Sequence, residues 1–193
     1  MSKEIEKIVL GSGDLYTVEF SDTIPDDATI ETDNNRLSYI QGGATLEYKP
    51  EYYTAEDDKG VVSKTIITKE EATLKSGIMT WCGNTLKKLC STARVTEKSG
   101  KRTVKIGGRS KDDGKKYLFR FVHSDPTDGK IRITIVGKNQ SGFSLAFAKD
   151  KETVIDAEIK AQPHDSDGTL IIYEEEMPTD TNPTEQTNEN KGA

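Results

Sequence analysis

Residues 42–71, GGATLEYKPEYYTAEDDKGVVSKTIITKEE, are the stretch of sequence that decides the fold. Residues 44–53 and 61–68 are extended runs rich in Tyr, Val, Ile and Thr, and an acidic turn at Asp57 and Asp58 joins them. At the usual rise of a strand, two arms of eight to ten residues reach about 30 Å. We therefore predict a β-hairpin that is longer than the body of a domain of this size.

The apolar side chains of this hairpin need a dry surface, because an isolated two-stranded ribbon is only marginally stable in water. In one interpretation both arms lie inside a sandwich and the side chains are ordinary core. In the other, the ribbon pairs its edges with a neighbour and buries its tyrosines in an interface. Pro50 fits an edge or a bulge. The candidate interface residues are Tyr48, Pro50, Tyr52, Tyr53, Val61, Val62, Ile66 and Ile67.

The rest of the chain also shows strand chemistry. Short Gly/Asx turns separate runs in which apolar residues alternate with polar ones, as in Ile131, Ile133 and Ile135. Tyr117, Phe119 and Phe121 share one face, opposite Leu118, Arg120 and Val122. The pattern predicts a mainly β protein: an antiparallel β-sandwich or barrel, one face dry and the other mostly wet, with one flanking α-helix and a long protruding β-hairpin.

The flanking helix is expected over Lys75–Cys90. The apolar residues Ile78, Cys82, Leu86 and Leu89 have helical spacing, Ser76 is the candidate N-cap, and Met79 and Trp81 would widen the buried stripe. The cysteines Cys82 and Cys90 would then be about 12 Å apart along the helix, beyond disulfide reach. With no histidine nearby they do not predict a metal site, and we expect two small buried apolar residues in a reducing compartment.

Composition limits the domain count and the class. The 193 residues suffice for one domain, and 31% of them are charged, against about 25% in ordinary domains. The net charge of −6 argues against a general nucleic-acid binder. Residues 1–10 lack an apolar segment, so no signal peptide is expected, and no apolar run is long enough to predict a membrane span. We expect one domain over residues 1–176 and a disordered acidic C-terminal tail over 177–193.

Several segments together resemble a known family. These are residues 43–48, 51–53, 57–58, 62–71 and 74–81, and the order of elements fits over roughly 37–173. They are similar to the major tail protein, or tail tube protein, of long-tailed bacteriophages that infect Gram-positive bacteria. The resemblance implies β-sandwich subunits, six to a ring, whose long hairpins bridge stacked rings into a conduit for genome ejection. Residues 42–71 would be the bridging arm and 75–90 the flanking helix.

The same resemblance implies the partners and the location. The partners would be further copies of the chain, a tape measure protein and tail terminator or baseplate proteins, with DNA passing transiently and no membrane. The protein would lie in the virion tail after assembly in the host cytoplasm, without cofactor or metal. A contractile tail or a phage-tail-like bacteriocin would use a similar subunit. Some members carry a further immunoglobulin-like C-terminal domain, for which this sequence shows only the acidic tail.

A tube that carries DNA needs a bore that does not hold it. Inward-facing cations would exchange counterions with phosphates and grip the duplex, whereas carboxylates repel it. Glu47 and Glu51 lie on the polar side of the first arm and are the candidate lumen-facing acidic residues.

Basic residues gather after the predicted helix: ten between Arg94 and Arg120, against three acids. With Tyr117 and Phe119 nearby, they allow a β-barrel module that grips single-stranded nucleic acid. They also fit plain solvated strands, or a patch that meets the acidic hairpin turn or residues 174–176 of a neighbour. The candidate assembly patch consists of Lys101, Arg102, Lys105, Arg109 and Lys111.

An enzyme has little support. His123, Ser124 and Asp125 are the residue types of a catalytic triad, but neighbours on a strand point to opposite faces. Residues 107–111 contain glycines and a lysine without the spacing of a phosphate-binding loop. We expect no catalysis.

Overall fold

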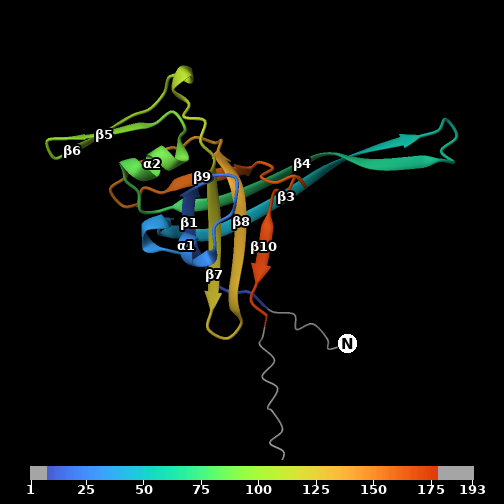
Figure 1. Ribbon diagram of the computed structural model, residues 1–193, viewed down its shortest axis with the longest axis horizontal. Coiled ribbons are helices and arrows are strands. Elements are labelled where there is room, and N and C mark those ends of the chain that lie inside the picture. The colour runs from blue at the N-terminus through green and yellow to red at the C-terminus, as the bar shows by residue number, and fades with distance from the viewer. Residues whose placement is uncertain (1–7, 178–193) are drawn as a thin grey trace, which may run out of the picture.

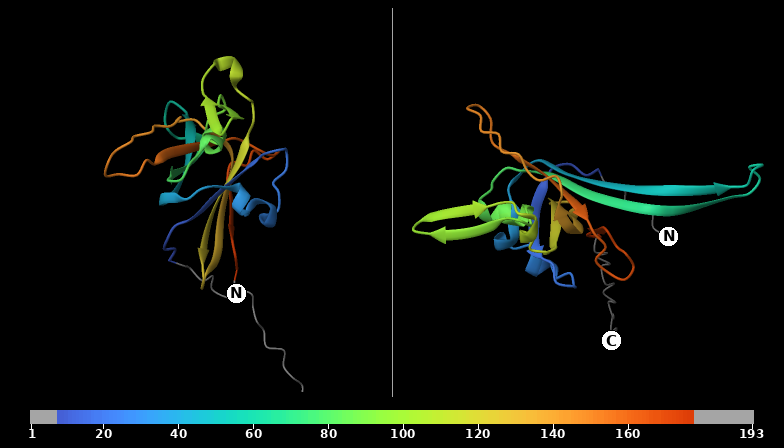
Figure 2. Two further views of the ribbon diagram at one scale, coloured as in Figure 1. Left: turned by 90° about the vertical axis from the view of Figure 1, so that its left-hand side faces the viewer. Right: turned by 90° about the horizontal axis from the view of Figure 1, so that it is seen from above.

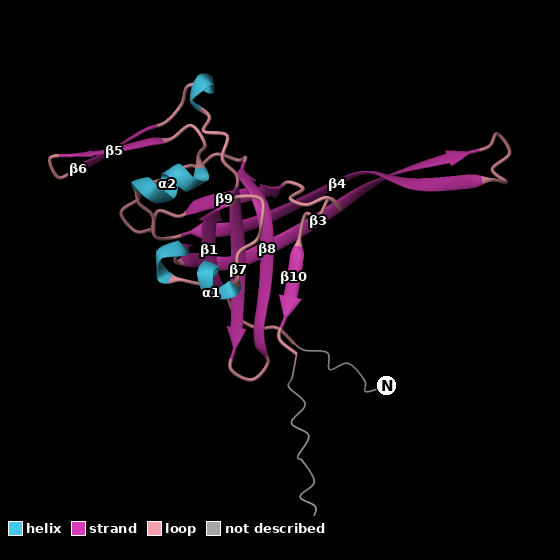
Figure 3. Cartoon of the chain, in the orientation of Figure 1, coloured by secondary structure: helices cyan, strands magenta, loops and turns pink. Residues whose placement is uncertain are grey.

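The computed structural model describes residues 8–177, in which strands dominate (Figures 1 and 3). In chain order the elements are β1 (Gly13–Glu19), α1 (Asp27–Ile30), the 3-10 helix η1 (Asp33–Asn35), β2 (Arg36–Ser38), β3 (Ile40–Glu56), β4 (Ser63–Ile78), α2 (Gly83–Leu89), β5 (Arg94–Lys98), β6 (Lys101–Lys105), the 3-10 helix η2 (Arg109–Lys111), β7 (Tyr117–Asp125), β8 (Gly129–Asn139), β9 (Ile155–Ala161) and β10 (Ile172–Glu175). All strand pairs are antiparallel.

One large sheet bends into two layers. Its order is β2-β1-β7-β8-β9-β4-β3, with β10 on β8. In Figure 1, β1, β7 and β8 run across the direction of β3 and β4. The bend lies where β8 meets β9, a contact limited to residues 137–139 of β8. A Cβ on Gly137 would lie 2.0 Å from the Lys160 carbonyl oxygen, so only glycine permits this close approach.

Two apolar clusters fill the faces of the β1-β7-β8 layer. The larger lies between this layer, β4, β9 and α2, and includes Leu15, Phe119 and Leu74. The smaller lies under α1 and includes Tyr16 and Ile30. Strand β7 is therefore buried on both faces from Tyr117 to His123, and the expectation of one wet face is wrong for this strand. The alternation of residues along β7 was predicted correctly, but α1 covers the face that was expected to be wet.

The predicted helix over Lys75–Cys90 is wrong in its first half. Lys75–Ile78 complete β4, and Ser76 pairs with Ala44 and Ala157 instead of capping a helix. Leu74, Ser76 and Ile78 are all buried, at a spacing of two. Residues on one face of a strand repeat every two positions, and residues on a helical stripe repeat every three or four. Positions four residues apart satisfy both patterns, so Ile78 also fitted the helical stripe.

Helix α2 is short and begins at Gly83. Cys82 is the N-cap of this helix, and the backbone N–H of Cys82 donates to the Thr85 hydroxyl at 3.2 Å. Lys87 and Lys88 lie in the last turn, where their charges favour the helix dipole. Cys82 and Cys90 flank the helix as free thiols. Cys82 is exposed and Cys90 is half-buried, so the expectation of two buried residues is wrong, because Cys82 lies at the N-cap instead of on the buried stripe. Met79 is exposed and does not join the stripe, whereas Trp81 packs against the larger cluster.

The long hairpin protrudes from the body (Figures 1 and 2). Its strands pair from Ile40 with Ile78 out to Glu56 with Ser63, so it is longer than the predicted 42–71. At its tip the Asp57 carboxylate accepts hydrogen bonds from the N–H groups of Val61 and Val62, at 2.6 and 2.7 Å. The predicted fold class is confirmed: a mainly antiparallel β protein with a large sheet and a long hairpin, to which the structure adds the short helix α1.

The last strand lies within the predicted domain, residues 1–176. Residues Ile172–Glu175 form β10, which pairs with residues 131–134 of β8. The predicted disordered tail, 177–193, lies outside the described residues except for Met177, and the domain boundary remains a prediction. Within residues 8–177 no helix is long and apolar enough to cross a membrane.

Candidate interaction surface

The hairpin β3–β4 has a supported half and an unsupported half. Near the body, Ala72, Leu74 and Ile78 are fully buried, since β9 pairs with β4 over residues 73–78 and the core lies beneath. Beyond Pro50 every residue of β3 is exposed, as is every residue of β4 before Glu71. We call residues 51–69 the distal arm.

The structure places the predicted interface residues together on this hairpin. Pro50 is half-buried, and the others are exposed to the following extents: Tyr48 49%, Tyr52 61%, Tyr53 58%, Val61 79%, Val62 67%, Ile66 48% and Ile67 50%. The interpretation that both arms lie wholly inside the sandwich is wrong for the distal arm in the isolated chain.

Both faces of the distal arm carry apolar pairs. Tyr52 lies opposite Ile67, and Tyr53 lies opposite Ile66, which places the two pairs on opposite faces of the ribbon. A bulge adjoins them, between Glu51 and Tyr52, one residue beyond Pro50. A ribbon with apolar pairs on both faces cannot bury both against a single flat surface.

The edges of the distal arm are also open. Among the described strands, β3 is the last in the sheet, and β4 has no second partner before Thr73. Unpaired N–H and C=O groups along such edges are templates for another strand. Exposed apolar side chains and open edges together define an interaction surface.

The face of β3, β4 and β9 that points away from the core carries paired charges. The acids are Glu47, Glu51, Glu71, Asp156 and Glu158, and the bases are Lys49, Lys69, Lys75 and Lys160. Each of the four lysines lies within 4.0 Å of a carboxylate; the distances are 3.0 Å for Lys75–Glu47, 3.1 Å for Lys49–Glu47, 2.6 Å for Lys69–Glu71 and 3.3 Å for Lys160–Glu71. The face is close to neutral, and its cations are already occupied.

The two candidate lumen residues lie on this charged face. Glu47 bonds Lys75 and Lys49, and these hydrogen bonds hold the pKa of its carboxyl below the usual value. Glu51 is more exposed and lies 3.5 Å from Lys69. No lumen is present in a single chain, so their orientation in a tube stays a prediction.

The candidate basic patch lies at the other end of the molecule. Strands β5 and β6 form a separate two-stranded ribbon, followed by η2. Arg102 bonds Glu97 at 2.7 Å. Within residues 8–177 the other four patch residues have no carboxylate partner; they are Lys101, Lys105, Arg109 and Lys111. Tyr117 and Phe119 are buried in the larger cluster, so they cannot stack on bases as the nucleic-acid interpretation required.

A buried cluster of charges lies under α1. Arg120 bonds Thr134 at 2.8 Å and pairs with Asp27, while Arg132 pairs with Glu31 at 2.5 Å. Glu174 and Glu176 join from β10 and the residue after it, at 3.5 Å from Arg120 and 3.1 Å from Arg132. Glu174 and Glu176 therefore face their own chain, whereas Glu175 is exposed on the opposite face of β10. The sequence signal for this cluster was Arg120, a charge between the apolar residues Leu118 and Val122.

The candidate catalytic residues do not form a triad. The Nδ1 atom of His123 lies 2.7 Å from the Ser12 carbonyl oxygen, and Asp125 accepts hydrogen bonds from the N–H groups of Thr127 and Asp128. In the part of the chain that the structure describes, no group of three or more His, Cys, Asp or Glu residues could hold a metal ion.

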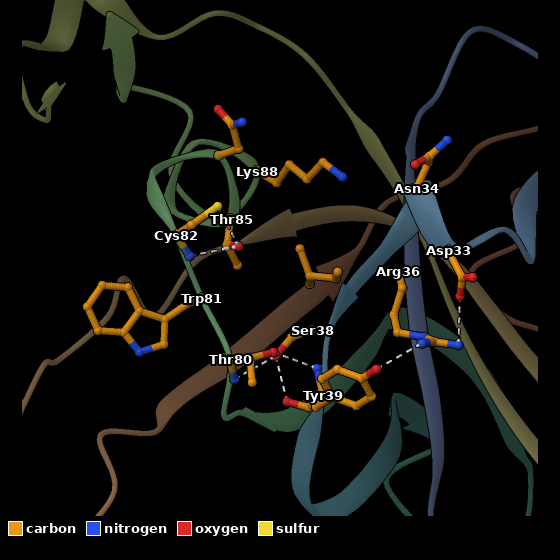
Figure 4. A pocket seen from close by; sticks show the side chains of 12 residues that line it. Asp33, Asn34, Arg36, Ser38, Tyr39, Thr80, Trp81, Cys82, Thr85 and Lys88 are labelled. Atoms are coloured by element: carbon orange, nitrogen blue, oxygen red, sulfur yellow. Dashed lines mark hydrogen bonds and ion pairs between the residues drawn. The ribbon is translucent and has the colours of Figure 1, made fainter. Parts of the chain in front are cut away.

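A pocket of about 610 Å³ lies between α2 and the η1–β2 segment (Figure 4). Its polar groups bond one another: the Thr80 hydroxyl accepts from the Tyr39 N–H at 2.9 Å, and Arg36 pairs with Asp33 at 3.1 Å. Burial lowers the pKa of Lys88 at its rim. The contacts hold β2 against the segment that precedes α2, which is a structural role.

Comparisons with known proteins add little. No family model matches the chain, and no curated protein matches it. Among solved structures, a chain from the virion of a native gene transfer agent (GTA) particle is similar with a TM-score of 0.39 and 10% identity, over 83% of this chain and 95% of that chain. At this level of similarity neither the role nor the partners of that particle transfer to this chain.

Proposed function

We propose that this chain is a structural subunit of a bacteriophage virion, the tail tube protein, which assembles into stacked rings through which DNA passes into the host. The observation that carries the proposal is the distal arm, which places apolar pairs on both faces and open edges outside the body. A second support is the resemblance of residues 43–81 to tail tube proteins. The proposal makes the protein a non-enzymatic building unit.

The two faces of the distal arm fit insertion between two neighbouring surfaces. The pair Tyr52 and Ile67 would meet one surface and the pair Tyr53 and Ile66 the other. Heterologous contacts join two different surfaces, so a pair of copies still has one free surface of each kind. Repetition of the contact therefore closes a ring or extends the assembly along an axis. Six copies to a ring, together with tape measure, terminator and baseplate partners, are part of this proposal on the strength of the resemblance.

The paired charges of the β3-β4-β9 outer face fit a bore for DNA. Lysines that already contact carboxylates have less to gain from phosphates than free lysines have, so a duplex would slide past them. We propose that this face, with Glu47 and Glu51, lines the lumen. Charge reversal of Glu47 and Glu51 to Lys should slow genome release from otherwise intact tubes, and unchanged release kinetics would contradict it.

Negative-stain electron microscopy of the concentrated protein tests the function. We expect hollow filaments of uniform diameter. The matched variant replaces residues 50–70 with Asn-Gly, which joins the directly paired Lys49 and Glu71 through a two-residue turn. It should fold, as judged by circular dichroism, and form no filaments. Absence of filaments from the intact chain at high concentration would refute the proposal.

The same test separates the alternatives. A subunit of a contractile tail or a phage-tail-like bacteriocin would also form filaments, so filaments alone support a tube of any of these kinds. A nucleic-acid-binding module would stay monomeric and retain labelled oligonucleotides on a filter at moderate salt.

A further inference from the structure

The β5–β6 ribbon carries like charges directly opposite one another. Arg94 pairs with Lys105 and Lys98 pairs with Lys101, with Thr96 and Thr103 between them. Directly paired residues share a face, so one face of this ribbon holds four cations. Arg94 donates to the carbonyls of Thr92 and Gly107, at 3.0 and 2.9 Å, which leaves the three lysines without an acceptor of this kind. Like charges opposite one another destabilise a strand pair, and a two-stranded ribbon has little stability to spare. Such a face is therefore costly unless an anion covers it.

The cationic face is turned away from the body. The other face carries Val104 and Arg102, and a Cβ on Gly83 would lie 2.7 and 2.8 Å from those two side chains. That face therefore packs on the start of α2. Within the described chain, Lys98, Lys101 and Lys105 are exposed and have no carboxylate partner.

An acidic group of the same chain lies at the opposite end of the molecule. The tip of the long hairpin carries Glu56, Asp57 and Asp58, against the single Lys59. Hydrogen bonds from the N–H groups of Val62 and Val61 lower the pKa of Asp57, so this carboxylate stays ionised. Glu56 and Asp58 are exposed and form no ion pair within residues 8–177.

The positions of the two groups exclude a contact within one copy. The β5–β6 ribbon and the hairpin tip point in opposite directions along the longest axis (Figures 1 and 2). In the other acidic segment considered as a partner, residues 174–176, two of the three carboxylates are occupied, because Glu174 contacts Arg120 and Glu176 contacts Arg132. The tip is an acidic group with two exposed carboxylates, Glu56 and Asp58, that form no ion pair within residues 8–177 and are available to a second copy.

We propose that the outward face of the β5–β6 ribbon receives the acidic hairpin tip of a neighbouring copy. This contact rests on the proposed function, and it adds the surface on a neighbouring copy that binds the tip of the arm. It runs head to tail, so repetition extends an assembly instead of closing a dimer. The attraction is between exposed charges and is screened over about 8–10 Å at physiological ionic strength, so assembly weakens as salt rises.

Two charge-reversal variants test the contact. Lys98→Glu/Lys101→Glu makes the ribbon end acidic, and Glu56→Lys/Asp58→Lys makes the tip basic. Each variant alone should lose filaments, because tip and ribbon then repel. An equimolar mixture should restore them, because the ribbon of each variant matches the tip of the other. Lys149→Glu/Lys151→Glu, at two exposed loop lysines, is the control with the same change in charge and should assemble as the intact chain does.

Electron microscopy and sedimentation velocity over a series of salt concentrations provide the readout, with circular dichroism to confirm folding. Filaments from Lys98→Glu/Lys101→Glu alone would overturn the contact while the tube function stands. Loss in both variants without rescue by mixing would show that the tip is not the occupant. If Lys98→Glu/Lys101→Glu keeps filaments but loses binding of a labelled oligonucleotide, the ribbon serves nucleic acid and the proposal fails. No filaments from the intact chain would refute the tube function itself.

Discussion

The two halves of the β3–β4 hairpin are built from the same kinds of residues and differ in what lies beneath them. Near the body, Leu74 and Ile78 are fully buried, while in the distal arm Ile66 and Ile67 remain about half exposed. Both halves belong to one continuous ladder. Strand chemistry thus explains why the ladder forms along its whole length, but the core decides which part is stable without a neighbour.

The difference shows how one element can serve two purposes. Burial of a large aliphatic side chain contributes about 1.5–3 kcal/mol. In the half near the body this stabilisation is present in the isolated chain. In the distal arm it would arise only when a partner covers the apolar side chains. Substitutions in the two halves should therefore change different measurements, and this can be tested with matched residues.

Leu74→Ala should have the largest effect on the isolated chain. Removal of a fully buried leucine typically costs about 2–5 kcal/mol of unfolding free energy, because the core is left with a cavity. Urea denaturation followed by circular dichroism measures the change. Ile67→Ala in the distal arm is the matched control and should stay within about 0.5 kcal/mol of the intact chain. Equal losses at the two sites would show that the distal arm packs on its own body.

The next prediction has a smaller expected effect than Leu74→Ala and compares a buried carboxylate under α1 with an exposed carboxylate on the arm. Burial raises the pKa of Glu31, but hydrogen bonds from Arg132 and Lys130 outweigh it, and the pKa is lowered overall. The carboxylate therefore adds stability above its unfolded pKa of about 4.3, and this contribution is lost as pH falls through the lower folded value.

Glu31→Gln should accordingly flatten the loss of stability below about pH 4.3. Thermal unfolding over a pH series measures the slope, and Glu51→Gln on the exposed arm is the control. An unchanged slope in Glu31→Gln would mean that the cluster under α1 does not stabilise the fold in this way.

The smallest effect on the isolated chain should come from Tyr53→Ser/Ile66→Ser. These side chains are exposed, so the unfolding free energy should change by no more than about 0.5 kcal/mol. Filament formation should be lost, because one apolar face of the arm disappears. Tyr52→Ser/Ile67→Ser tests the other face in the same way. If either variant still forms filaments, that face of the arm has no partner.

Prediction from the sequence succeeded where local chemistry and tertiary structure agree. The length of the hairpin predicted that it protrudes, and the alternation along the strands predicted the fold class. The role of Tyr52, Tyr53, Ile66 and Ile67 in an interface stays a prediction. The helix over Lys75–Cys90 failed because Ser76 and Ile78 belong to a strand whose partners, β3 and β9, are remote in the chain. The charge cluster under α1 was missed for the same reason, since Arg120 and Asp27 are far apart in sequence.

The sequence by itself determined most of the strands, where the turns fall and which arm is long, since these follow from side-chain alternation and from Gly/Asx turns. Only the tertiary structure decided which strand faces are covered. It placed α1 over the second face of β7, left the distal arm without support, and set the cationic ribbon and the acidic tip at opposite ends. Alternation along a chain records the two faces of a strand, whereas their burial depends on elements that the chain brings back from a distance.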